Sequence, residues 1–152
     1  MHASPRQLVV APDRFDIVSD DVVLIADLSS ALAVCIYDAV EEAGALLHLR
    51  IIVRNGHYPA DVTDSTLATE LLLLDRCVES LREAAPASRN LQAKIVVHRV
   101  EDERAQLALE AMLMLVKDFL TDAGVRVALS DISAGEAREL RFRPSMGWLQ
   151  IR

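Results

Sequence analysis

The sequence contains few aromatic residues, few cysteines and no long uncharged apolar run. Phe, Trp and Tyr make up 4% of its 152 residues, so a core must come mainly from Val, Leu, Ile and Ala, as in layered proteins of helices and sheets. The longest apolar tract, Leu107 to Val116, includes Glu110 and is too short to cross a bilayer. The N-terminal segment up to Pro12 lacks the apolar region of a signal peptide. We therefore expect a cytoplasmic protein that does not insert into membranes.

The cysteines and the charge exclude further classes. Cys35 and Cys77 match no metal-ligand spacing and do not indicate an oxidising compartment, and we expect neither a metal nor a cofactor. With 16 basic and 23 acidic residues, the net charge of -7 argues against a nucleic-acid partner, because such binding needs clustered Lys and Arg. The arginines near the C-terminus are interpreted as a solvated strand face: Arg138, Arg141, Arg143 and Arg152.

Length and apolar runs together predict one domain, residues 1–152, that is rich in strands. Apolar runs bounded by Pro, Gly or Asp predict strands at Leu8–Ala11, Phe15–Val18, Val22–Ala26, Ala31–Tyr37, Ala45–Val53, Ala93–Val100, Val125–Ser130 and Glu139–Phe142. Trp148–Arg152 is a candidate edge strand, and a turn is expected at Pro12–Asp13. A few acidic residues separate the fourth run from the fifth, which indicates a hairpin.

Two segments have helical instead of strand periodicity. The first ends before Pro86, and its apolar residues recur at intervals of three and four on one face: Leu67, Leu71, Leu74, Val78 and Leu81. The second runs from about Asp102 to Ala123, with Gly124 as its C-terminal cap and an inward face of Leu109, Met112, Leu113, Val116 and Leu120. Met112 and Met114 are interpreted as core residues in preference to an interface. The predicted fold class is α+β, a layered α/β sandwich of mixed, largely antiparallel sheet with two long helices.

The segment from Leu28 to Asp38, Leu-Ser-Ser-Ala-Leu-Ala-Val-Cys-Ile-Tyr-Asp, resembles the signature of the chemoreceptor glutamine deamidase (CheD) family. That signature reads Leu-Gly-Ser-Cys, then a small-apolar strand, then Leu/Ile-Tyr-Asp. Further similar stretches follow in the family's order at Tyr58–Asp61, Leu91–Ile95, Phe119–Asp131 and Arg138–Arg152. The resemblance implies a CheD-like fold and a reaction in which a cysteine attacks the side-chain amide of a receptor glutamine, with a histidine activating the thiol.

Ala31 stands at the position of the family's cysteine, and His48 stands at that of its histidine, seventeen residues later. Alanine has no atom that can form an acyl-enzyme, so we expect no catalytic residue, with His48 the only candidate retained. The resemblance also places Ile25 where the family has a threonine that orients the histidine. Asp27 and Ser29 replace two glycines, so side chains are added where the family's backbone contacts substrate.

Two more segments depart from the family pattern. Val96–His98 replaces Gly-Gly-Ala, and Asp131–Ala134 replaces an Asp-Xaa-Gly-Gly turn. Asp27, Ser29 and Ser30 are the residues expected to line the degenerate site. These independent departures suggest natural loss of the whole site instead of a single substitution.

No other residue is expected to supply the missing nucleophile. Cys35 lies on the same strand face as the alanine but about 13 Å along the strand, at roughly 3.3 Å per residue. Cys77 is interpreted as a buried, inert thiol, and Ser30 would point to the opposite strand face. His48 is most simply a core histidine with one satisfied nitrogen, and a metal site shared with His98 would need carboxylates that the sequence does not place.

Two functions remain open at this point. In the first, the protein is non-catalytic, keeps the deamidase scaffold and acts in chemotaxis or signalling by binding a protein. The resemblance implies as partner the helical cytoplasmic region of chemoreceptors or a CheC-like phosphatase. The alternative is an active glutamine deamidase, an amidohydrolase with an unrecognised nucleophile, and an unrelated structural domain is a third possibility.

Overall fold

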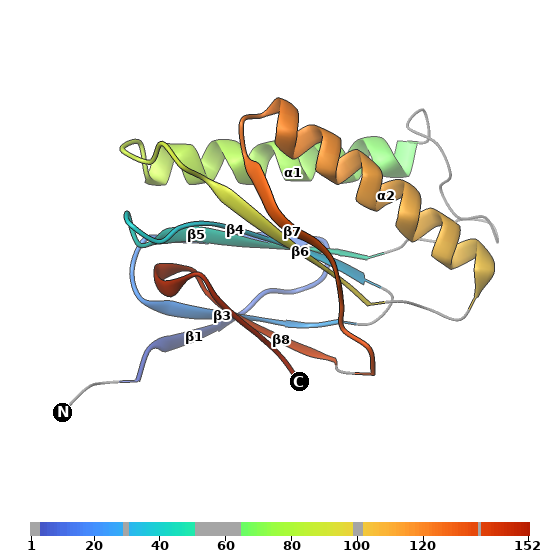
Figure 1. Cartoon of the computed structure of the whole chain (residues 1–152), viewed down its shortest axis with the longest axis horizontal. Helices are drawn as coiled ribbons and strands as arrows, with labels where there is room; N and C mark the ends of the chain where they lie inside the picture. The colour runs from blue at the N-terminus through green and yellow to red at the C-terminus, as the bar shows by residue number, and fades with distance from the viewer. Residues whose placement is uncertain (1–3, 29–30, 51–64, 99–101, 137) are drawn as a thin grey trace.

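The chain folds into three layers. The computed structural model describes residues 4–28, 31–50, 65–98, 102–136 and 138–152. In chain order the elements are β1 (Arg6–Val9), β2 (Arg14–Val18), β3 (Val22–Asp27), β4 (Ala31–Asp38), β5 (Ala43–Arg50), α1 (Ser65–Ala84), β6 (Gln92–Val97), α2 (Glu103–Asp122), β7 (Arg126–Ser133), β8 (Glu139–Arg143), a 3₁₀ turn (Pro144–Met146) and β9 (Trp148–Ile151). Figure 1 shows both helices above a five-stranded sheet, with a four-stranded sheet below it.

The two sheets are mixed and largely antiparallel. The five-stranded sheet has the order β2-β5-β4-β6-β7, and the four-stranded sheet has the order β1-β3-β8-β9. β1 pairs with β3 and β6 pairs with β7 in parallel, while the other described pairs are antiparallel. The predicted α+β class is therefore confirmed, as is the β4–β5 hairpin.

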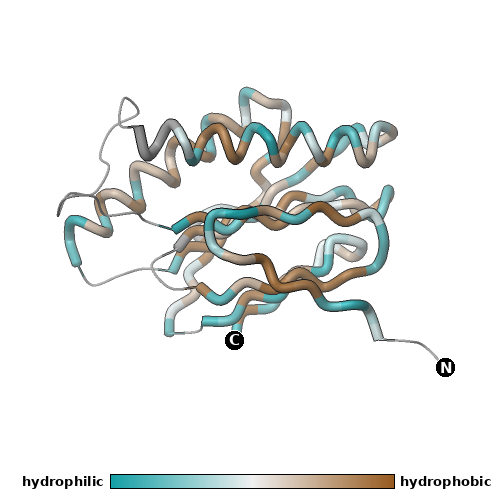
Figure 2. The backbone as a smooth tube through the Cα atoms, turned by 180° about the vertical axis from the view of Figure 1, so that it is seen from behind, coloured by the Kyte–Doolittle hydropathy of each residue, from teal (hydrophilic) through white to brown (hydrophobic). Residues whose placement is uncertain are grey.

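The central strand β4 is buried on both faces. Leu32, Val34 and Ile36 pack in the cluster beneath the helices, whereas Ala33 and Cys35 pack in a second cluster between the sheets. Because strand side chains alternate between faces, a strand covered on both sides has a continuous apolar sequence. Figure 2 shows that apolar segments are concentrated in the strands of the sheets, whereas apolar and polar segments alternate along the helices.

Helix α2 has the ends and the inward face that were predicted. Asp102 accepts hydrogen bonds from the backbone N–H groups of Arg104 and Ala105 at 2.8 and 3.3 Å, which caps the N-terminus. Gly124 has φ 80°, in the left-handed region, and its N–H donates to Thr121 O, a Schellman-type end. The five predicted inward residues are buried. The prediction for Met114 is wrong, because that side chain is 65% exposed.

The buried face of α1 differs from the predicted one by one position. Leu74, Val78 and Leu81 are buried as predicted. Leu71 is only half-buried, and its place in the buried face is taken by Glu70. Positions 70, 74, 77, 78 and 81 still recur at intervals that keep one helix face together. The Leu67 side chain lies outside the described residues.

Several predicted boundaries are corrected. The turn at Pro12–Asp13 is confirmed, and it carries the chain from the four-stranded sheet to the five-stranded one. β7 continues to Ser133, so the turn expected at 131–134 lies instead at Gly135–Glu136. Residues 51–53 and 99–100 of two predicted strands lie outside the described residues, as does the 58–61 stretch of the resemblance.

The arginines near the C-terminus lie on the outer sheet and bind nearby acids. Arg141 and Arg152 contact Glu139 at 2.6 and 3.0 Å. Arg143 donates to Asp21 through Nε at 2.7 Å and through Nη2 at 2.5 Å. Two carboxylates thus pair with three of the four arginines, which offsets part of their positive charge.

Candidate functional site

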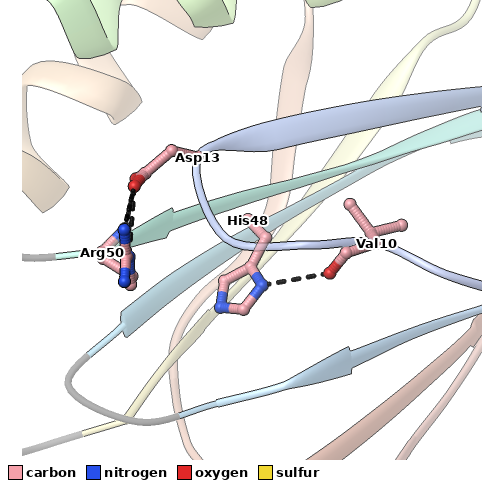
Figure 3. Close-up of polar contacts among 4 residues, drawn as sticks. All are labelled: Val10, Asp13, His48 and Arg50. Atoms are coloured by element: carbon pink, nitrogen blue, oxygen red, sulfur yellow. Dashed lines mark hydrogen bonds and ion pairs between the residues drawn. The ribbon is translucent and has the colours of Figure 1, made fainter.

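His48 lies in β5, beside the turn that joins β1 to β2. In the ladders it pairs with Arg14 of β2 on one side and with Ala33 of β4 on the other. Its side chain is 1% exposed, and Nδ1 lies 3.3 Å from the carbonyl oxygen of Val10 (Figure 3). Because a carbonyl can only accept, Nδ1 carries the proton and Nε2 presents a lone pair.

An ion pair holds the β1–β2 turn against the end of β5. Arg50 donates through Nε and Nη2 to Asp13 Oδ2 at 3.1 and 2.8 Å, and its backbone N–H donates to Asp13 Oδ1 at 3.2 Å (Figure 3). The Asp13 N–H in turn donates to the His48 carbonyl at 2.7 Å. Asp13 has φ 59°, a conformation that Asp tolerates better than most residues. These contacts fix the turn that carries Val10 and thereby orient the imidazole.

A cavity of about 580 Å³ opens at this corner of the molecule, a size typical of ligand sites. Its wall combines the short apolar segment Val9, Val10, Ala11 and Pro12 with three polar side chains, those of Asp27, His48 and Arg50. The structure thus brings together two residues of the predicted site, Asp27 and His48. Arg50 was not predicted to take part, because its role depends on a contact with the distant residue Asp13.

Burial favours the neutral form of the imidazole. Burial is the main cause that lowers the pKa of His48, and Arg50 lowers it further. The Val10 hydrogen bond and the charges of Asp13 and Asp27 act in the opposite direction without cancelling the effect of burial. No hydrogen bond to Nε2 is found among the described residues. The site therefore contains a buried acceptor that has no partner in the described part of the chain, which is unusual for a polar atom in a folded protein.

A second buried acceptor lies on the helix side of the same corner. Glu70 of α1 is 4% exposed, and its Oε2 has no hydrogen-bond partner in the described part of the chain. Burial raises the pKa of Glu70 to about 7, the charge of Asp13 raises it as well, and Arg50 lowers it. Glu70 lies four residues before Leu74 of the apolar face, and this helical spacing is the one signal in the sequence that could have identified it.

The other predicted site positions are placed less directly. Ala31 begins β4 and pairs with Arg50, two residues before Ala33, the residue opposite His48. Ile25 contacts the site through backbone: its carbonyl accepts from Val10 N–H at 2.7 Å. Its side chain alternates with Leu24 and Ala26, which pack between the sheets, so it lies on the other face of β3. Ser29 and Ser30 lie outside the described residues.

Both cysteines are enclosed in apolar surroundings. Cys35 is 0% exposed between the sheets, and its burial raises the pKa of the thiol despite the nearby charge of Lys94. Ala33 lies opposite His48 in the ladder, and Cys35 and Ala31 are each two residues from Ala33 along β4. Cys35 is therefore no farther along the strand from His48 than Ala31 is. Distance along the strand therefore does not exclude Cys35, and burial is the stronger argument. Cys77 is also 0% exposed, with its pKa raised to about 12.

The chain is distantly homologous to CheD chemoreceptor glutamine deamidases over nearly its full length. It is 26% identical over 134 residues, 86% of this chain and 81% of the relative, to the chemoreceptor glutamine deamidase CheD of Thermotoga maritima. It is 25% identical over 146 residues to the probable chemoreceptor glutamine deamidase CheD of Rhizobium meliloti, covering 95% of this chain and 79% of that protein. The equivalent protein of Bordetella parapertussis is 24% identical, over 98% of this chain and 70% of its own length. No protein-family model matches the chain.

None of the described helices is long and apolar enough to cross a membrane. Within the described ranges, no group of three or more His, Cys, Asp or Glu side chains is arranged to hold a metal ion.

Proposed function

We propose that this protein is a non-catalytic relative of the CheD deamidases that acts in chemotaxis or a related signalling system by binding a protein. The observation that carries the proposal is the surroundings of His48. An alanine begins the strand where the resemblance requires the nucleophile, and the described thiols of Cys35 and Cys77 are enclosed, with pKa values raised by burial. A neutral, enclosed thiol is a poor nucleophile, and His48 then has nothing to activate.

The proposed partner is a chemotaxis protein. The distant relatives are named as chemoreceptor glutamine deamidases. The first candidate is therefore the partner that the family resemblance implies, the helical cytoplasmic region of a chemoreceptor. A CheC-like phosphatase is the second candidate, on the strength of the family resemblance. Both partners place the protein in the cytoplasm. A cavity beside a histidine that has no nucleophile to activate is consistent with a surface that serves binding alone.

Binding is tested with the purified chain immobilised and the two candidate partners supplied in solution. Ala11 lies in the cavity wall. Ala39 follows the end of β4 that is remote from Arg50, and both alanines are exposed. Ala11→Trp should therefore weaken partner binding at least tenfold, while Ala39→Trp, the matched control, should leave it unchanged. Surface plasmon resonance gives both affinities. If the two variants bind like the unmodified protein, the cavity is not the docking surface, and if neither partner binds, the chemotaxis assignment is wrong.

A further inference from the structure

The wall of the cavity includes two side chains that can accept hydrogen bonds, His48 and Asp27. The His48 tautomer, set by the Val10 carbonyl, leaves Nε2 as an acceptor that is 99% buried with its residue and unpaired in the described part of the chain. In Figure 3 this nitrogen is on the side of the ring away from Val10. A buried acceptor without a partner costs free energy, which a ligand that donates a hydrogen bond would recover.

The charge of the cavity is negative once its internal ion pair is counted. Arg50 is held by Asp13 through two side-chain hydrogen bonds, so that pair is neutral. Asp27 is exposed at the end of β3, and no hydrogen bond or ion pair of its carboxylate is found among the described residues. Its charge nevertheless acts on the imidazole, since it raises the pKa of His48. Among the described residues of the cavity wall, the unneutralised charge is therefore that of Asp27.

We propose that this cavity binds a basic side chain, Lys or Arg, of the partner protein. An N–H group of the cation donates to His48 Nε2, and the charge pairs with the Asp27 carboxylate. The segment from Val9 to Pro12 packs against the apolar stem of the side chain, as long basic side chains require. The inference rests on the proposed binding function and specifies what the site recognises, a cation in place of the neutral glutamine amide.

The test uses blocked amino acids that differ only in the side chain: N-acetyl-lysinamide, N-acetyl-argininamide, N-acetyl-glutaminamide and N-acetyl-norleucinamide. Each is titrated into the ¹⁵N-labelled full chain, and NMR follows the His48 ring nitrogens and the backbone amides of Val10 and Asp27. The lysine or arginine probe should bind about tenfold more tightly than the glutamine probe, a difference typical of one charge-assisted contact. The His48 Nε2 resonance should shift with the same affinity.

Three variants complete the design. Asp27→Asn should abolish the preference for the cationic probe, Asp27→Glu should retain it, and Asp118→Asn, an exposed acid on α2, should leave it unchanged. Equal or tighter binding of the glutamine probe, or a preference that survives Asp27→Asn, would overturn the proposal. Conversion of the glutamine probe to glutamate is a separate result: it would refute the non-catalytic function, whatever the order of affinities.

Discussion

At the scale of single residues, one of the two buried acceptors near the Asp13–Arg50 pair was predicted from the sequence and the other was not. His48 was identified from its spacing to Ala31 within the family resemblance. Glu70 was not, because apolar periodicity identifies a helix face but does not indicate when a polar residue occupies it. Arg50 was missed for a related reason, since its partner Asp13 is 37 residues away and only the tertiary turn brings the two together.

Glu70 should make stability depend on pH. Its pKa is about 7 in the folded chain and 4.5 when unperturbed, so the folded state retains a proton that the unfolded state loses. The free energy of unfolding should therefore fall as pH rises from about 4.5 to about 7 and stay level above that range. The full effect is about 3 kcal/mol.

Glu70→Gln removes this titration and keeps the shape of the side chain. Urea unfolding at several pH values should show that the variant is the more stable protein at pH 8 and has lost most of its advantage at pH 4.5. Glu79→Gln, an exposed position of α1, is the control and should leave the pH profile unchanged. Parallel profiles for Glu70→Gln and the unmodified chain would show that Glu70 does not titrate as a buried group.

At the scale of elements, the helix and strand positions were largely predictable, whereas the distribution of the strands between two sheets was not. β3 and β4 both have continuous apolar sequences, yet β3 pairs with β1 and β8 while β4 pairs with β5 and β6. The pattern of apolar residues along a strand shows which of its faces are buried, but it does not indicate which strand it pairs with. The error at Leu71 has a similar origin, since one position on a helix shifts a side chain by about 100°.

The corrected face of α1 gives a direct mutational test. Leu74 is 0% exposed and belongs to the cluster beneath the helices, whereas Leu72 is 49% exposed. Leu74→Ala should lower the free energy of unfolding by about 2–5 kcal/mol, and Leu72→Ala should change it by less than about 0.5 kcal/mol. Chemical denaturation measures both. Equal losses in the two variants would mean that α1 is rotated relative to the described position.

Gly44 tests the contact between β5 and the 3₁₀ turn that precedes β9. A Cβ built there would lie 2.7 Å from the backbone oxygen of Ile36 and in contact with the Pro144 ring. Gly44→Ala should therefore destabilise the chain by about 1–3 kcal/mol through overpacking. Gly135→Ala is the control, because nothing lies within 4 Å of its Cβ and only its φ of 59° opposes the substitution. A smaller loss at Gly44 than at Gly135 would contradict this packing.

At the scale of the whole molecule, the two hydrophobic clusters share β4 and β5. Alternate residues of β4 belong to one cluster or the other, so neither cluster can be disrupted while the other keeps its strand in place. One domain, residues 1–152, stays a prediction, and we propose that it unfolds in a single cooperative transition.

Two spectroscopic signals can test that cooperativity. The single tryptophan, Trp148, lies in β9 of the four-stranded sheet, while far-UV circular dichroism reports mainly on α1 and α2 in the outer layer. Denaturation followed by fluorescence and by circular dichroism should give superimposable curves. Separate midpoints would show that the four-stranded sheet unfolds independently of the helical layer.

The absence of catalysis is the central claim, and it is tested most directly by mass spectrometry of a chemoreceptor cytoplasmic fragment incubated with the protein. Deamidation of a glutamine adds about one dalton to the peptide that carries it. We predict no gain above a control without protein, and no difference among the unmodified chain, His48→Ala and Cys35→Ala. A gain in mass that the unmodified chain produces and that His48→Ala abolishes would contradict the claim, and its loss in Cys35→Ala would identify the buried thiol as the nucleophile.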